Sequence, residues 1–291
     1  MKKLLITLTA CLSFSLQAAE AGLTLPNDDL PALEGDALII SQQSGMQVYV
    51  NNCLGCHSLE FQRYNRTAKD LQIPEDVMKE NLIFTDAKIG DLMKNNMSPE
   101  LAANWFGTAP PDLSVVARAR GTHWLYNYLR AFYVDSARPY GTNNSVFTDV
   151  GMPHAMERLQ GLQAKSDAVV ALEGQINEAK ATIASASIAM EQQDASDLEQ
   201  KISDAEKAIV DAEAELVSLS KAGKYFSIVK AGELTPEEFD HATADLVNFL
   251  DYIGEPIKQE RKRLGVWVLA FILFFGFVSY LLKKEYWKDV H

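Results

Sequence analysis

The sequence predicts a mainly α-helical protein with an inserted helical hairpin and one C-terminal transmembrane helix. Apolar and aromatic residues recur at helical spacing through much of the chain, while the alternation typical of strands is scarce. Residues 157–223 repeat apolar positions at heptad spacing, which is typical of a coiled coil. Residues 264–282 form an uncharged apolar run long enough to cross a bilayer. Together these observations indicate a helical domain tied to a membrane.

The N-terminus has the pattern of a bacterial secretory signal peptide. Two lysines precede a mostly apolar stretch, 4–16, and Ala-Glu-Ala at 19–21 is a small-x-small cleavage pattern. The apolar stretch is short for a membrane span, which disfavours an uncleaved anchor. A lipidation site at Cys11 is disfavoured because the apolar segment before it is unusually brief. We therefore expect residues 1–21 to be removed and the rest of the chain to be exported.

The stretch Cys53-Leu54-Gly55-Cys56-His57 holds both cysteines of the mature chain beside a histidine. Cys-x-x-Cys-His is the attachment signature of haem c, because two thiols about one helical turn apart can each add to a haem vinyl group. A tetrahedral zinc site would need more ligands, and a thioredoxin-type dithiol would need a βαβ setting that the sequence does not show. We expect one covalently attached haem c, with His57 as an iron ligand.

The other face of the iron admits methionine, histidine or no protein ligand. The candidates are His123, His154 and His241 among the histidines and Met78, Met93, Met97, Met152 and Met156 among the methionines. Methionine on a helix is more often core packing than ligand. Met152 differs because it lies in a loop between Gly151 and Pro153, where proline stiffens the backbone. Local chemistry favours Met152 and leaves Met156 and His154 as alternatives.

The segment between the haem motif and Met152 contains short helical stretches and turns. Pro110 and Pro111 cannot lie inside a helix but can lead into one, and Asp112 or Ser114 could cap the helix after them. Residues 115–133 carry apolar and aromatic residues at helical spacing, which predicts that helix.

Residues 157–223 differ in composition, with many Ala, Glu, Gln, Ser and Lys and no aromatic residue or proline. Apolar positions alternate steps of four and three residues in two runs. They are Leu172, Ile176, Ala179, Ile183, Ala186 and Met190, then Leu198, Ile202, Ala205, Ile209, Ala212, Leu216 and Leu219. The pattern predicts an antiparallel hairpin whose seam is thin because of its alanines. Either an insertion that packs on itself or a docking arm for a partner would fit, and the first is favoured.

A capped helix should come after the hairpin. Thr235, Pro236 and Glu238 have the spacing of a capping box with proline in the first turn. The apolar face of this helix comprises Phe239, Leu246, Phe249, Leu250 and Ile253.

The run 264–282 is flanked by Arg-Lys-Arg and Lys-Lys, which excludes a buried soluble helix. Positive residues lie on both sides, so their count does not orient the span. The haem motif orients the span, because it should be exported. Residues up to about 263 should therefore lie in the periplasm and residues 283–291 in the cytoplasm.

The chain is acidic, with 27 Lys+Arg against 39 Asp+Glu and a formal net charge of −12. Many of the basic residues lie at the two ends, so the exported part is more acidic still. This charge argues against nucleic-acid binding and suits basic partners or simple solubility.

Several stretches occur in the order in which the cytochrome c1 family has them. They are QVYVNNCLGCHSLEFQRYNR, APPDLSVVARAR, VGMPHAM and LTPEEFDHATADLVNFLDYIGEPIKQERKRLG. The chain thus resembles the haem c subunits of quinol:cytochrome c oxidoreductases (cytochrome bc1 complexes) over about 45–156 and 233–288. The resemblance implies a class I cytochrome c-like haem domain on the periplasmic side of the bacterial inner membrane.

The resemblance also implies the roles of individual residues. Matched residue by residue, they are Cys53 and Cys56 for the thioether bonds, His57 and Met152 for the iron, Arg120 for a haem propionate, and Pro110 and Pro111 for the haem edge. A surface arginine is the alternative for Arg120. The implied organisation is a signal peptide (1–21), a haem domain in two parts (22–156 and 224–263), the hairpin (157–223), the transmembrane helix (264–282) and a tail (283–291).

The function that the resemblance implies is electron transfer from a Rieske iron–sulfur protein to a cytochrome c. The partners would be cytochrome b and the Rieske subunit, in a complex that is dimeric, and this subunit would not be catalytic on its own. Segment 157–232 departs from the family, whose members run a short loop there, so its role is not implied. Two other hypotheses are a tethered cytochrome that feeds a terminal oxidase, and a haem sensor or assembly adaptor with the coiled coil as its output.

Overall fold

The computed structural model of the chain describes residues 25, 30–190 and 196–288. The expected signal peptide and the expected turn of the hairpin lie outside the described residues. The helices are α2 (Gly35–Asn52), α3 (Tyr64–Asp70), α4 (Glu75–Asn81), α5 (Pro99–Phe106), α6 (Val116–Arg120), α7 (Thr122–Arg130), α8 (Glu157–Gln160), α9 (Asp167–Met190), α10 (Ser196–Lys221), α11 (Pro236–Gly254) and α12 (Lys258–Tyr286). The strands are β1 (Leu59–Arg63), β2 (Leu92–Met93), β3 (Phe132–Val134), β4 (Thr142–Asn144), β5 (Gly161–Lys165) and β6 (Phe226–Ala231). The predicted mainly helical class is confirmed.

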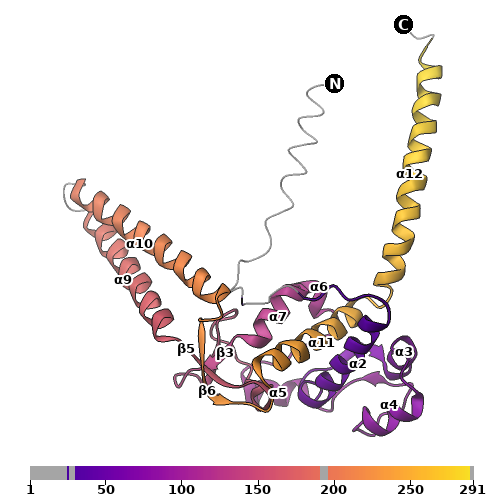
Figure 1. Cartoon of the computed structure of the whole chain (residues 1–291), viewed down its shortest axis with the longest axis horizontal. Helices are drawn as coiled ribbons and strands as arrows, with labels where there is room; N and C mark the ends of the chain where they lie inside the picture. Colours follow the sequence, from indigo (N-terminus) through magenta and orange to yellow (C-terminus); the bar gives the residue numbers. More distant parts are fainter. Residues whose placement is uncertain (1–24, 26–29, 191–195, 289–291) are drawn as a thin grey trace.

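The core of the body is built on the crossing of α2 and α11 (Figure 1). The five residues predicted for the apolar face of α11 are all buried, and the rings of Tyr49 and Phe249 lie 5.7 Å apart between the two helices. Gly45 permits the close approach, because a Cβ there would overlap the carbonyl oxygen of Asp245. The predicted capping box of Thr235 and Glu238 starts α11.

Residues 115–133, predicted from the sequence as one helical stretch, contain two helices and the first two residues of β3. Gly121 separates α6 from α7. Its φ of 87° is a backbone conformation that residues other than glycine rarely adopt. The first of these helices has no side-chain cap, so the expected role of Asp112 or Ser114 as its cap is wrong. Both side chains instead accept hydrogen bonds from backbone N–H groups of β1.

The strands form three antiparallel two-stranded pairs, β1–β2, β3–β4 and β5–β6. The third pair supports the helical hairpin: Lys165 pairs with Phe226 at one end and Gly161 with Ala231 at the other. The lysine also contacts Glu173 of α9, with Nζ 2.6 Å from Oε1. The helical hairpin of α9 and α10, called the arm below, is therefore joined to the rest of the protein by the paired strands β5 and β6. The sequence did not predict these strands.

Helices α9 and α10 lie side by side and project away from the body (Figure 1). Five of their buried residues fall on predicted seam positions: Ile176, Ala179, Ala186, Ala205 and Ala212. Val169 and Ser220 are also buried but were not predicted as seam positions. A regular coiled-coil interlock of these side chains remains a prediction.

Helix α12 leaves the body at the end opposite the arm (Figure 1). Within the described part of the chain it is the one helix long and apolar enough to cross a membrane, and none of its apolar stretch is buried. Ion pairs join its start to the end of α11: Lys258 Nζ lies 2.6 Å from Asp251 Oδ2, and Arg261 contacts Glu255.

Candidate functional site

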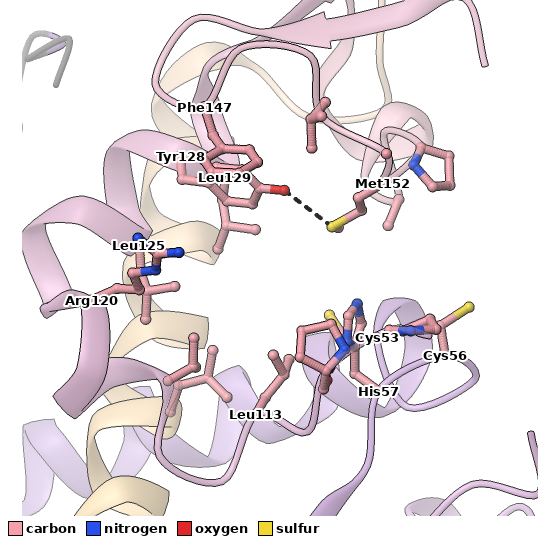
Figure 2. Close-up of a pocket in the computed structure, with 18 of the residues that line it drawn as sticks. Cys53, Cys56, His57, Leu113, Arg120, Leu125, Tyr128, Leu129, Phe147 and Met152 are labelled. Carbon is pink, nitrogen blue, oxygen red and sulfur yellow. Dashed lines mark hydrogen bonds between the residues drawn. The ribbon is translucent and has the colours of Figure 1, made fainter. Parts of the chain in front are cut away.

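A cavity of about 330 Å³ lies between the end of α2, the 110–113 loop, α6, α7, the loop before α8, and α11 (Figure 2). Its lining is mostly apolar, with Leu113, Leu125, Leu129, Phe147 and Leu246 among the wall residues. The seven residues predicted to bind the cofactor all line it: Cys53, Cys56, His57, Pro110, Pro111, Arg120 and Met152.

The cysteine motif forms a turn directly after α2. The backbone N–H groups of Cys56 and His57 both donate to the carbonyl of Cys53, at 3.0 and 2.8 Å. This turn brings both cysteines and the imidazole to one wall of the cavity, with the side chain of Cys56 pointing away from it (Figure 2). Both cysteines are free, with Cys53 buried and Cys56 exposed. Burial, reinforced by the nearby Cys56, raises the pKa of the Cys53 thiol to about 12, so this thiol is neutral at physiological pH.

The His57 ring is held in one tautomer. Its Nδ1 lies 2.7 Å from the carbonyl oxygen of Pro111, which can only accept a hydrogen bond, so Nδ1 carries the proton. Burial lowers the pKa of His57, although the Pro111 carbonyl and the charge of Asp112 oppose this. A neutral ring with a protonated Nδ1 leaves the Nε2 lone pair free, which is the state required of a metal ligand.

The 110–114 loop is fixed to the residues directly after the motif. Asp112 accepts hydrogen bonds from the backbone N–H groups of Glu60 (2.7 Å) and Ser114 (2.8 Å). Leu113 N donates to the Ser58 carbonyl at 3.0 Å. These bonds set the position of the carbonyl that holds His57, and they explain why Asp112 does not cap a helix.

Met152 lies across the cavity from His57 (Figure 2). Its sulfur accepts a hydrogen bond from the hydroxyl of Tyr128 at 3.4 Å. Burial raises the pKa of Tyr128 to about 12, so the hydroxyl keeps its proton at neutral pH.

The other sixth-ligand candidates do not line the cavity. Met156 is 3% exposed in the core, and the His154 ring stacks on Phe132 with centroids 4.8 Å apart. Met78 and Met93 are fully buried elsewhere in the core, while His241 lies on the surface. Geometry thus brings Met152, and none of the alternatives, to the wall opposite His57.

Among the lining residues that the structure describes, Arg120 is the one lysine or arginine. Its guanidinium lies over the ring of Trp124, 5.1 Å from the centroid. Such a cation at the rim of an apolar cavity can pair with an acidic group of a bound molecule, since the rest of the lining offers that group no other positively charged side chain of lysine or arginine.

The donor set fits a c-type haem. Two thiols, a neutral imidazole and a thioether on the opposite wall match the groups that hold covalent haem, and the apolar walls match a flat macrocycle. Sequence reasoning missed Tyr128, because an aromatic residue at helical spacing indicates core packing. The fold alone brings its hydroxyl to the methionine sulfur.

Comparisons with known proteins identify the family of this chain. The profile described as "Cytochrome C1 family" matches residues 39–218 and 227–290. The chain is 41% identical to cytochrome c1 of Allochromatium vinosum over 251 residues, which cover 86% of this chain and 85% of that protein. It is 37% identical to the ammonia monooxygenase gamma subunit of Nitrosomonas europaea, with 86% and 84% covered. Cytochrome c1 of Blastochloris viridis is 23% identical, with 99% and 97% covered. This chain belongs to the cytochrome c1 family.

Proposed function

We propose that this chain carries one covalently attached haem c and passes electrons from a Rieske iron–sulfur protein to a cytochrome c. The observation that carries the proposal is the placement of His57 and Met152 on facing walls of one apolar cavity, with Cys53 and Cys56 beside the histidine. In this assignment the two cysteines form the thioether bonds, and the histidine and methionine bind the iron.

Family membership gives the general role. The cytochrome c1 family comprises membrane-anchored c-type cytochromes that transfer electrons in the bc1 complex, with cytochrome b and a Rieske protein as partners. The single long apolar helix in the described part of the chain, α12, suits that anchor. The direction of electron flow, the cytochrome c acceptor and a dimeric complex belong to the proposal.

The bound haem supplies the one-electron chemistry, and the chain supplies the surroundings that tune it. The Pro111 carbonyl orients His57 and increases the basicity of its ring. Met152 provides a neutral thioether, which favours the reduced iron and raises the midpoint potential. The apolar walls act in the same direction, because they disfavour the additional positive charge of the oxidised state. Arg120 would balance a propionate at the rim, and Pro110 would shape the haem edge.

The haem domain belongs, in this proposal, on the periplasmic side of the bacterial inner membrane. Residues 1–21 act as the signal peptide, 22–156 and 224–263 form the haem domain around the inserted hairpin (157–223), 264–282 cross the membrane, and 283–291 end in the cytoplasm. A cysteine-accessibility assay on whole cells, with single cysteines introduced at Lys230 and Lys284, tests this orientation.

A detergent pull-down of the tagged chain from its own membranes tests the function. We expect b-type haem, a Rieske centre and quinol-dependent cytochrome c reduction to accompany the chain, and haem to remain on it after denaturation. Recovery of the chain with haem c but without b haem would favour a tethered electron carrier. Recovery of ammonia-oxidising activity instead would favour the role that the Nitrosomonas relative's name describes.

A further inference from the structure

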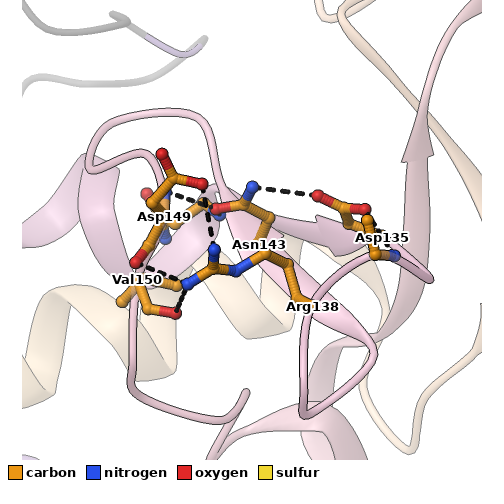
Figure 3. Close-up of polar contacts among 7 residues, drawn as sticks. Asp135, Arg138, Asn143, Asp149 and Val150 are labelled. Atoms are coloured by element: carbon orange, nitrogen blue, oxygen red, sulfur yellow. Dashed lines mark hydrogen bonds and ion pairs between the residues drawn. The ribbon is translucent and has the colours of Figure 1, made fainter. Parts of the chain in front are cut away.

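The backbone just before Met152 is held by one arginine from a neighbouring turn (Figure 3). Arg138 lies in the turn between β3 and β4. One of its terminal nitrogens donates to the carboxylate of Asp149 at 3.0 Å, and the other donates to the carbonyls of Asp149 (2.7 Å) and Val150 (3.2 Å). The guanidinium fork therefore fixes two consecutive peptide groups, the second of which lies two residues before Met152.

Asn143 of β4 holds the same loop through the backbone of Asp149 (Figure 3). Its side-chain oxygen accepts the backbone N–H of Asp149 at 2.9 Å, and its amide nitrogen donates to Asp135 at 2.9 Å. Asp135 in turn accepts the N–H of Ala137 at 3.0 Å, which ties the asparagine to the turn that carries Arg138. We name Arg138, Asn143 and Asp149 the loop clamp.

The backbone at Asp149 is strained. Its φ is 59°, a left-handed conformation that costs free energy in a residue other than glycine. Such a conformation persists only where the surroundings enforce it, and here the N–H and C=O of Asp149 are both bonded by the clamp. Gly151 lies two residues after Asp149 and adds freedom to the chain, so nothing within residues 149–151 themselves would hold Met152 still.

We propose that Arg138 is a positioning residue that keeps Met152 on the iron by fixing the backbone of Asp149 and Val150. This inference rests on the proposed role of Met152 as an axial ligand. A thioether is a weak ligand. The fraction of iron that it occupies therefore depends on the conformational entropy that its loop gains when the sulfur dissociates: the smaller this gain, the higher the occupancy. The clamp keeps that freedom small, and its charge-assisted bonds to two carbonyls contribute more than the exposed ion pair to Asp149.

The test uses the complete complex in detergent, with Arg138→Gln, Arg138→Lys, Met152→Leu and a control, Arg66→Gln. The control removes an arginine from another arginine–aspartate pair, Arg66–Asp70, which lies on α3. Haem retained after denaturation normalises each sample. The readouts are the far-red absorption band of the oxidised thioether-bound haem and carbon monoxide binding to the reduced haem.

We expect Arg138→Gln to weaken the far-red band and to raise the carbon monoxide-reactive fraction about tenfold, the size expected when charge-assisted bonds to the backbone are lost. Arg138→Lys should give an intermediate value, because lysine can still donate to one carbonyl. The Arg66→Gln complex should behave like the unmodified one.

The two proposals fail in different ways. An unchanged far-red band in Met152→Leu would remove Met152 as ligand and with it the basis of this inference. If Met152→Leu loses the far-red band and the Arg138→Gln complex is unchanged, Met152 remains the ligand and only the positioning role of Arg138 is overturned. If the Arg138→Gln complex does not accumulate, the Arg138→Lys complex provides the test. The proposal is overturned if this complex matches the unmodified one in both the far-red band and carbon monoxide binding. A partial change in these two readouts supports it.

Discussion

The hydroxyl of Tyr128, in the last turn of α7, donates a hydrogen bond to the sulfur of Met152 at 3.4 Å. A thioether sulfur has two lone pairs, so one can accept this bond while the other remains for a metal. The bond withdraws electron density from the sulfur and weakens it as a donor. Oxidised iron needs that donation more than reduced iron does, so the bond should raise the midpoint potential.

Replacing Tyr128 by Phe should therefore lower the midpoint potential. A neutral hydrogen bond contributes about 1 kcal/mol, which for one electron corresponds to at most roughly 40 mV. Potentiometric titration of the c-type haem in the complex measures the change. A potential that stays constant or rises would show that the hydroxyl does not tune the sulfur.

Replacing Met152 by Leu should lower the midpoint potential by more than the Tyr128 change and open the iron to carbon monoxide. The leucine keeps the apolar volume and removes the donor atom, so the lost ligand is the principal difference. Met156→Leu is the matched control, because that methionine is buried in the core and does not line the cavity. Equal effects of the two substitutions would contradict the assignment.

Replacing Asp112 by Ala should loosen the wall that holds His57. The substitution leaves the N–H groups of Glu60 and Ser114 without their carboxylate acceptor, which should lower the free energy of unfolding by about 1–3 kcal/mol. Urea denaturation of the detergent-purified chain measures the loss. Asp112→Asn retains an oxygen acceptor, so it should lose less than the alanine variant.

Replacing Gly45 by Ala should be severely destabilising, by more than about 3 kcal/mol, because the new methyl group would overlap the backbone of α11 at Asp245. The same substitution at Gly174 on the exposed face of α9 meets nothing and should stabilise that helix by about 0.5–1 kcal/mol. Thermal melts of the two variants should shift in opposite directions.

Replacing Asp245 by Asn should change how stability depends on pH. Burial raises the pKa of Asp245, against the hydrogen bond from Ser41 and the nearby His241. Because the folded chain holds this proton more tightly than the unfolded chain, the group favours folding at acid pH, and that contribution is lost as pH rises through the raised pKa. The asparagine variant should melt higher than the unmodified chain at pH 7 and should lose this pH dependence, as thermal melts at pH 4 and pH 7 would show.

The sequence predicted those parts of the site that local chemistry determines. Cys-x-x-Cys-His carries its function in its spacing, and the Gly-Met-Pro context of Met152 distinguishes it from helical methionines. Asp112 shows the limit: its side chain could equally cap a helix or bond a distant strand, and only the fold brings Glu60 within its reach. Arg138 and Tyr128 carry no local signal, because their partners lie many residues away in the chain.

The fold was predictable to a similar degree. The capping box of α11, its apolar face and the helices of the arm can be read from spacing. The strands could not, because they are short. In addition, β5 reads Gly-Leu-Gln-Ala-Lys, with no β-branched residue and no clear alternation. The break at Gly121 was missed for another reason: apolar spacing continues across it, and only its φ of 87° divides the helix.

The pairing of Lys165 with Phe226 has a consequence for how the domain accommodates its arm. The polypeptide departs from the electron-transfer domain and returns to it at neighbouring points, so the domain has the same connectivity whatever lies between them. Residues 166–225 could be exchanged for a two-residue turn, which would leave an ordinary β-hairpin at the surface. The length of the arm is therefore set independently of the path that the chain takes along the cofactor-binding wall.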